Sequence, residues 1–257
     1  MLEVADSLIK ADGFNHLAGI VILAGGASKR MGSPKAELIL PTGERLLDYH
    51  IRQALELSAA MMSNMPIMLA DNGRGFSVNA DLIKSSKSSI FHIRDYLSAN
   101  ALSSKNISGK NLSNKDDKSI ETGGALVAIE SALQSLASSN QLTKDASWQQ
   151  SWLLVISCDS LIPITDLWQK LQPYITQAAD KSVICLTDDS HLYPLLGLYR
   201  LDMEPNLKRY IDDEQRQVMK FIKPIVQPVP FTQAWQALTN FNTPKAFASA
   251  CLALNDS

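Results

Sequence analysis

A short apolar run followed closely by two glycines limits the folds open to this chain of 257 residues more than any other feature. The run at residues 19–22 has the continuous apolar character of a buried parallel strand. The paired glycines, Gly25 and Gly26, let the backbone turn sharply and approach a ligand closely. We expect the N–H groups of this turn to form an anion-binding nest, beside a following helix whose positive end points at the same ligand. The turn therefore predicts an α/β fold with a phosphate site.

Two basic side chains, Arg30 and Lys35, come soon after the glycines and add full positive charges to this expected site. The spacing excludes a Walker A loop, which ends in Gly-Lys-Ser/Thr, and it excludes the dinucleotide fingerprint Gly-x-Gly-x-x-Gly. An ordinary glycine turn between a strand and a helix is the simpler alternative.

The whole pattern, Leu-Ala-Gly-Gly-x-x-x-Arg-Met-Gly-x-x-Lys, resembles the signature loop of the molybdenum cofactor guanylyltransferases. These enzymes belong to a larger group of nucleotidyltransferases with a nucleotide-diphospho-sugar transferase-like fold. The resemblance implies a doubly wound α/β domain with a mainly parallel sheet and helices on both faces. It also implies that the nucleotide is bound by Leu23, Ala24, Gly25, Gly26 and Lys35.

The composition fits one soluble domain over residues 1–257, because 46% of residues are hydrophobic and 19% are charged. A net charge of -2 gives no basic field for nucleic acid, so we expect no nucleic-acid partner. The first residues lack the apolar core of a signal peptide, and no apolar run approaches the roughly 20 residues that cross a bilayer. We therefore expect a cytoplasmic protein with no membrane contact.

Apolar runs and periodic apolar positions predict alternating strands and helices along the chain. We expect further strands at residues 66–70, 89–93, 152–157, 182–186 and 194–199, and helices at 46–57, 124–136, from 165, within 205–221 and from 244. Ser, Asn and Lys fill 14 of the 24 positions from 98 to 121, where no apolar period is visible. We expect a mobile surface insertion there.

Two polar residues follow predicted strands and should lie near the glycine turn, since ligands of open α/β sheets bind outside the carboxyl ends of the strands. Asp95 follows residues 89–93, and by resemblance it falls at the acidic position of the family that helps to hold the guanosine. Asn72 stands two places after Ala70, where the family favours asparagine. An aspartate that caps its own turn is the alternative for Asp95.

Asp159 comes directly after the most strand-like run, residues 152–157. Magnesium prefers hard oxygen ligands, typically one or two carboxylates together with substrate phosphates. The segment Ser-Cys-Asp-Ser, followed by Pro163, resembles the family's Pro-Cys-Asp-Thr-Pro, whose aspartate binds the metal. The resemblance implies that Asp159 is the Mg²⁺ ligand and that Asp159, Lys35 and Arg30 form the catalytic set. A structural cap at the end of a strand is the alternative for Asp159.

Three further segments resemble parts of the family. Gly124 opens Gly-Ala-Leu-Val-Ala-Ile, similar to Gly-Pro-Leu-Ala-Gly-Ile beside the nucleotide, and Arg216 opens Arg-Gln-Val-Met, similar to Arg-Arg-Val-Met on the pterin side. Asn240 and Asn242 match Asn-x-Asn-Thr-Pro. On an extended segment these two amides would point to the same side and offer oxygens to a metal or a phosphate, a role compatible with capping the next helix.

By this resemblance the protein would transfer GMP from Mg-GTP to the phosphate of the molybdenum-bound pterin, releasing pyrophosphate. Its substrates would be GTP and the molybdenum-pterin cofactor, and its partners would be cofactor-biosynthesis proteins and molybdoenzymes. Two alternatives stay open. One is a related nucleotidyltransferase that transfers CMP to the same pterin or a nucleotide to a sugar phosphate, and the other is a non-catalytic nucleotide-binding regulatory module.

Overall fold

A computed structural model describes residues 17–26, 28, 30–96, 124–139, 150–188 and 190–255. The insertion predicted at residues 98–121 lies outside this part of the chain. In chain order the elements are β1 (Leu17–Leu23), η1 (Lys35–Glu37), α2 (Leu46–Ala60), β2 (Ile67–Ala70), α3 (Ala80–Ser85), β3 (Ile90–His92), α5 (Gly124–Ser139), β4 (Trp152–Ser157), α7 (Ile164–Leu171), α8 (Tyr174–Gln177), β5 (Val183–Thr187), β6 (Leu192–Arg200), η2 (Leu201–Met203), α9 (Glu204–Asp212), α10 (Val218–Ile222), β7 (Val226–Pro230), η3 (Gln233–Leu238) and α11 (Pro244–Asn255).

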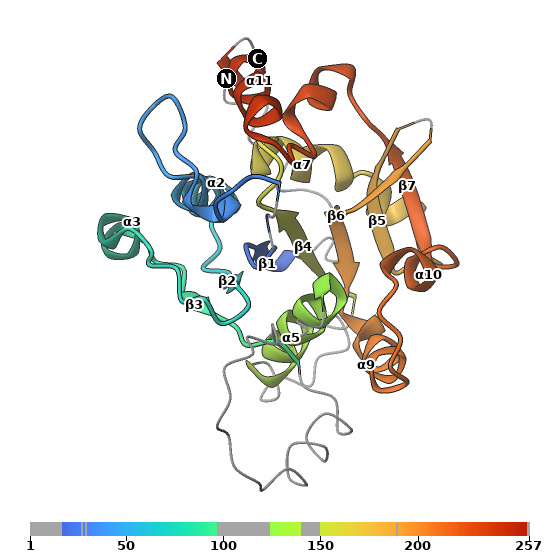
Figure 1. Cartoon of the computed structure of the whole chain (residues 1–257). Helices are drawn as coiled ribbons and strands as arrows, with labels where there is room; N and C mark the ends of the chain where they lie inside the picture. The colour runs from blue at the N-terminus through green and yellow to red at the C-terminus, as the bar shows by residue number, and fades with distance from the viewer. Residues whose placement is uncertain are drawn as a thin grey trace, which may run out of the picture.

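A seven-stranded sheet runs through the centre in the order β3-β2-β1-β4-β6-β5-β7 (Figure 1). β1 pairs in parallel with β2 and with β4, and the pairs β2/β3 and β5/β7 are also parallel. β6 is antiparallel to both of its neighbours, β4 and β5. The predicted α/β class with a mainly parallel sheet is confirmed.

Strand β4 shows why the central strands read as continuous apolar runs. Every residue of β4 is buried, and its side chains alternate between two apolar clusters on the two faces of the sheet. Leu154 and Ile156 belong to one cluster, and Leu153 and Val155 belong to the other. A strand covered on both faces has no position for a polar side chain to reach water, so the period-two pattern disappears.

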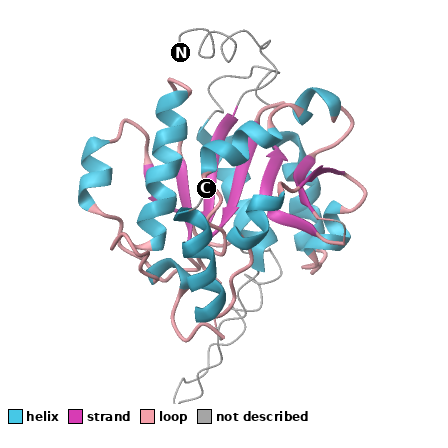
Figure 2. Cartoon of the chain, turned by 90° about the horizontal axis from the view of Figure 1, so that it is seen from above, coloured by secondary structure: helices cyan, strands magenta, loops and turns pink. Residues whose placement is uncertain are grey.

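Helices cover both faces of the sheet, as the view from above shows (Figure 2). α2, α7 and α11 contribute to the apolar cluster on one face, whereas α5, α9 and α10 contribute to the cluster on the other. This arrangement confirms the predicted doubly wound fold. None of the helices in the described part of the chain has both the length and the apolar character that crossing a membrane requires.

The position of β1 between β2 and β4 brings together the loops that follow these three strands, at the carboxyl ends of the strands. Leu23, the last residue of β1, lies opposite Ala70 at the end of β2 and opposite Ser157 at the end of β4. The backbone N–H of Cys158 donates to the carbonyl oxygen of Leu23 at 3.2 Å. Because the chain leaves β1 toward one neighbour and returns to the other, a crevice is expected at this edge.

The helix that follows the glycine turn begins at residue 46 as predicted, but it does not stand directly behind the turn. Residues Lys35–Glu37 form only a single 3₁₀ turn, and the next α-helix, α2, begins at Leu46. The intervening chain reverses at Gly43, whose φ of +83° favours glycine, and Ile39 pairs with Arg45 across the reversal. This tight reversal uses the residues that a first helical turn would need, so the glycine turn has no α-helix immediately behind it.

Candidate functional site

A cavity of about 340 Å³ opens at the edge where β1, β2 and β4 end. Most residues predicted to bind the nucleotide or the metal line this cavity. They are Leu23, Ala24, Gly25, Gly26, Lys35, Asn72, Asp95, Gly124 and Asp159, and they are joined by Ser28, Ala70, Ala125, Ala128, Ser157, Cys158 and Leu195.

The glycine turn lies tightly against the loop that follows β2. A Cβ atom on Gly25 would stand 2.8 Å from the Cβ of Asn72, a distance that real side chains do not tolerate, so only glycine fits here. A Cβ on Gly26 would meet nothing within 4 Å. The carbonyl oxygen of Gly26 instead accepts a hydrogen bond from Nη1 of Arg74 at 3.0 Å. Arg74, which the sequence analysis missed, thus holds the outer side of the turn.

Ser28 turns the loop back and ties it to Lys35. Its φ of +46° is unusual for a residue with a side chain, and its carbonyl oxygen accepts a hydrogen bond from the N–H of Met31 at 2.9 Å. The backbone N–H of Lys35 donates to Oγ of Ser28 at 3.3 Å. Met31 is only 6% exposed and anchors the loop in the core. The backbone of Lys35 is therefore fixed relative to the glycine turn.

The ammonium group of Lys35 joins three segments that are far apart in the sequence. Its Nζ lies 3.1 Å from Oδ2 of Asp159 and donates to Oδ1 of Asn242 at 2.8 Å. The side chains of Lys35 and Asp159 are 14% and 25% exposed, so both are shielded but reach the cavity. Within the described residues nothing donates to the second oxygen of Asp159, Oδ1.

The thiol next to this ion pair is buried and is not activated as a nucleophile. Cys158 is buried, and burial, followed by the charge of Asp159, raises the pKa of its thiol to about 12. A thiol with such a pKa stays protonated near neutral pH, and the thiolate is the nucleophilic form. The charged groups beside Cys158 are the ammonium of Lys35 and the carboxylate of Asp159.

A buried carboxylate organises the loop after β2. Asp71 accepts hydrogen bonds from the backbone N–H groups of Gly73 at 3.1 Å and Phe76 at 3.0 Å, and Nδ1 of His92 lies 2.9 Å from it. Burial, and then the negative charge of Asp71, raises the pKa of Asp95, which lies in the cavity wall. Asp95 is half-buried and faces the same cavity as Lys35.

The N-terminus of α5 contributes the positive helix end that the sequence analysis assigned to another helix. Gly124, the first residue of α5, has a φ of +76° and lines the cavity. Ala125, the next residue, and Ala128, about one turn further along, also line it, and their small side chains leave the space open. The partial positive charge of a helix N-terminus favours anions nearby.

Four of the predicted residues lie outside the cavity wall, namely Arg30, Arg216, Asn240 and Asn242. Arg30 is exposed, and Arg216 donates through Nη1 to the carbonyl oxygen of Ile211 at 2.6 Å, at the end of α9. Asn240 has a φ of +58°, so the chain there is not the regular extended segment that we expected. Its carbonyl oxygen accepts from Nδ2 of Asn242 at 3.1 Å, and this bond orients the Asn242 amide toward Lys35.

The described residues contain no cluster of three or more His, Cys, Asp or Glu side chains that could hold a metal ion by themselves. Asp159 offers one carboxylate whose Oδ1 accepts no hydrogen bond from the described residues. This donor set suits a hard cation such as Mg²⁺ that keeps several waters and shares its coordination with substrate phosphates. It does not suit a metal that needs an all-protein cage.

A family model described as "MobA-like NTP transferase domain" matches residues 20–72. This segment contains most of β1, the glycine turn, α2 and β2. The family resemblance seen in the glycine turn is confirmed there. No curated protein matches the chain.

Solved structures share the fold at low sequence identity. The chain is similar to molybdopterin-guanine dinucleotide biosynthesis protein A from Archaeoglobus fulgidus, with a TM-score of 0.58 and 15% identity, over 93% of this chain and 100% of that one. It is also similar to a homolog of Mycobacterium tuberculosis Rv0371c from Mycobacterium sp. strain JC1, with a TM-score of 0.50 and 12% identity, over 96% and 100% of the two chains. At these identities the likeness shows the fold, and with the family match it supports a nucleotidyltransferase.

Proposed function

We propose that this protein transfers GMP from Mg-GTP to the phosphate of the molybdenum-pterin cofactor, forming molybdopterin guanine dinucleotide and releasing pyrophosphate. One observation carries the proposal. The Lys35 ammonium and the Asp159 carboxylate lie 3.1 Å apart at a cavity whose other wall is the glycine turn. The A. fulgidus protein of the same fold bears the name of this biosynthetic step.

The proposed reaction needs positioning and charge stabilisation more than acid or base chemistry. The attacking group is a phosphate that is already ionised, so no strong base has to activate it. Lys35 would bind the triphosphate and stabilise the charge that develops on it. Asn242 would keep the Lys35 ammonium at the cavity, since its amide oxygen accepts from Nζ at 2.8 Å. Arg30, which is exposed and lies outside the cavity wall, would add positive charge near the triphosphate.

Asp159 would hold Mg²⁺ together with the nucleotide phosphates. Bound there, the ion would supply positive charge to the triphosphate oxygens. Two features of the chain position the Asp159 carboxylate for this role. Asp159 is fixed after a fully buried strand, and the ion pair with Lys35 orients its carboxylate toward the cavity.

We propose that guanine is selected by the side of the cavity that the loops after β2 and β3 form. Asn72 and Asp95 line this side, and the glycine pair Gly25-Gly26 resembles the guanylyl form of the family. A pocket that hydrogen-bonds one base rejects a base that leaves its buried polar groups unpaired. We also propose that residues 1–257 form one cytoplasmic nucleotidyltransferase domain that serves molybdoenzymes.

Pyrophosphate release tests this function directly. The purified protein is given molybdenum-pterin cofactor, Mg²⁺ and each of GTP, CTP, ATP and UTP, and we expect GTP to be preferred over CTP by at least about tenfold. Equal turnover with CTP, or turnover with a sugar phosphate only, would replace guanylyl transfer by one of the related reactions. Nucleotide binding without pyrophosphate release under any condition would favour a regulatory module.

A further inference from the structure

Helix α5, which lines the cavity with Ala125 and Ala128, also carries a carboxyl group that has no access to water. Glu130 is 0% exposed, and its neighbours Ile129 and Leu133 belong to the apolar cluster between the sheet and the pair α5 and α9. A carboxylate in such a place is costly unless its charge is compensated. The proposed reaction does not use this group.

The partners of Glu130 do not compensate a negative charge. Its Oε1 accepts from Nε2 of Gln134 at 3.0 Å, while its buried Oε2 has no hydrogen-bond donor. Helix α9 packs against α5, and its first residue, Glu204, brings a second carboxyl to the Glu130 carboxyl. Lys208 on α9 is the cation nearby, but it forms an ion pair with Asp212 instead.

Two carboxyl groups in contact, one of them buried, share a proton rather than ionise together. The positions of the two residues decide which one carries it. Glu204 is the first residue of α9, where the helix dipole stabilises a negative charge, whereas Glu130 lies in the interior of α5. Burial first, and then Glu204, raises the pKa of Glu130 to about 8. A protonated Oε2 also removes the unsatisfied atom, because it becomes a donor.

We propose that Glu130 is a positioning residue, protonated at neutral pH, whose Oε2–H donates to Glu204 and so clasps the cavity wall α5 to α9. Loss of this proton places two negative charges between the helices and loosens the wall that carries Gly124 and Ala128. The clasp itself does not depend on the proposed reaction. Only its effect on nucleotide affinity rests on the proposed function.

The expected pH dependence has a definite sign. The folded pKa of Glu130 lies above the ordinary value of 4.5, so the clasp contributes fully below pH 4.5, and its contribution is lost as the pH rises through about 8. In this window the folded protein holds one proton more than the unfolded chain. The equilibrium constant for unfolding should therefore rise by up to about tenfold per pH unit from this group alone.

Urea unfolding of the full chain between about pH 5 and pH 9 tests the clasp by comparing wild type with E130Q. The amide of E130Q donates to Glu204 at every pH, so the variant should lack this slope and become more stable than wild type above about pH 8. D213N, which removes an exposed charge at the end of the same helix α9, should keep the wild-type slope. Parallel profiles for wild type and E130Q would overturn the proposal.

Two further measurements keep the proposal testable if E130Q folds poorly. E204Q removes the charge that raises the pKa of Glu130, so its stability should fall with pH over a lower range than that of wild type. An unchanged profile in E204Q would contradict the clasp. Infrared spectra at neutral pH should show a protonated carboxyl band that E130Q lacks, and identical spectra would mean that Glu130 is ionised.

GTP affinity at about pH 9 relative to pH 7 gives the functional readout. Wild type should lose at least about threefold more affinity than E130Q, because only wild type loses the clasp in this range. If the stability slope appears but neither protein binds GTP, the proposed function fails and the clasp stands. If both proteins bind GTP with the same pH dependence, the link from the clasp to the cavity wall is wrong.

Discussion

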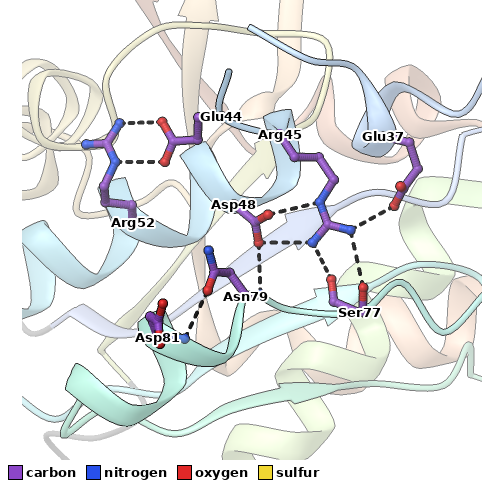
Figure 3. A network of polar contacts seen from close by, with 8 residues as sticks. All are labelled: Glu37, Glu44, Arg45, Asp48, Arg52, Ser77, Asn79 and Asp81. Carbon is purple, nitrogen blue, oxygen red and sulfur yellow. Dashed lines mark hydrogen bonds and ion pairs between the residues drawn. The ribbon is translucent and has the colours of Figure 1, made fainter. Parts of the chain in front are cut away.

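Two networks of basic side chains and carboxylates differ in how many of their hydrogen-bonding atoms are left without a partner among the described residues. The first is centred on Arg45, at the start of α2 (Figure 3). The second is centred on Lys35, at the cavity. Both contain an ion pair at about the same distance, 3.0 Å between Arg45 and Asp48 and 3.1 Å between Lys35 and Asp159.

The Arg45 network is saturated. Nε and Nη2 of Arg45 donate to the two oxygens of Asp48, each at 3.0 Å, and Nη1 donates to Glu37 at 3.1 Å. Asp48 also accepts from the backbone N–H of Asn79 at 3.1 Å, which ties α2 to the chain before α3. Figure 3 shows these groups pointing at one another, with the carbonyl oxygen of Ser77 completing the set.

The Lys35 network is incomplete by comparison, and it faces a cavity. Asp159 uses one oxygen for Lys35, and its other oxygen accepts nothing from the described residues. A saturated network fixes two segments and contributes to stability, whereas a network with an open oxygen at a cavity retains capacity for a ligand. The two ion pairs are alike in charge and in distance. They differ in whether both oxygens of the aspartate accept a hydrogen bond from the described residues.

The largest expected effect is on turnover, in Lys35→Ala. Removing one preorganised charge contact typically costs about 2.7–4 kcal/mol of transition-state stabilisation, so GTP-dependent pyrophosphate release should fall by at least about a hundredfold. Lys223→Ala, which removes an exposed lysine after α10, serves as the matched control and should turn over normally. Nearly normal release by Lys35→Ala would make this lysine a structural residue like Arg45.

The next effect is on stability, in Asp48→Asn. The amide keeps the size of the side chain but loses the charge that accepts three hydrogen bonds from Arg45 and Asn79, so unfolding should cost about 2 kcal/mol less. Turnover per folded molecule should stay near that of wild type, because Asp48 does not line the cavity. Urea unfolding and an activity assay on the same sample separate the two. Lost turnover with unchanged stability would reverse the contrast between the networks.

The smallest expected effect compares two adjacent glycines. A methyl group on Gly25 would collide with Asn72, so Gly25→Ala should displace the loop after β2 and weaken GTP binding by about tenfold. Gly26→Ala places the same methyl group in open space and should bind GTP within about twofold of wild type. Calorimetric titration of both proteins measures the ratio. Equal affinities would mean that the contact between the two loops does not shape the nucleotide site.

Much of the fold could be predicted from the sequence because the central strands are apolar without interruption. Strand β7 was missed because it carries Pro228 and Pro230, which normally argue against a strand. β7 tolerates both prolines since it is an edge strand with a single partner, β5. The helix after the glycine turn was expected to point its positive end at the phosphate site, but the reversal at Gly43 separates α2 from the turn, and no residue of α2 lines the cavity.

Only those residues of the candidate site that stand in short sequence motifs could be predicted. Asp159 and Lys35 stand in such motifs, but their 3.1 Å contact joins residues 124 positions apart, and local patterns do not encode it. Asn242 was predicted to offer oxygen to a metal or a phosphate, whereas its amide oxygen accepts from Lys35. Arg74 was missed because a lone arginine in a loop carries no signal until its carbonyl partner, Gly26, is near.

The central claim, that the Asp159 carboxylate is kept open for Mg²⁺ and the nucleotide phosphates, is tested most directly by turnover as a function of Mg²⁺ concentration. Wild type and Asp159→Asn are compared at saturating GTP and molybdenum-pterin cofactor, with circular dichroism confirming that both are folded. The amide keeps the size of the side chain and removes the charge that a hard cation prefers. We expect Asp159→Asn to lose Mg²⁺-dependent turnover and to recover only part of it at high Mg²⁺. Superimposable curves for the two proteins would contradict the claim.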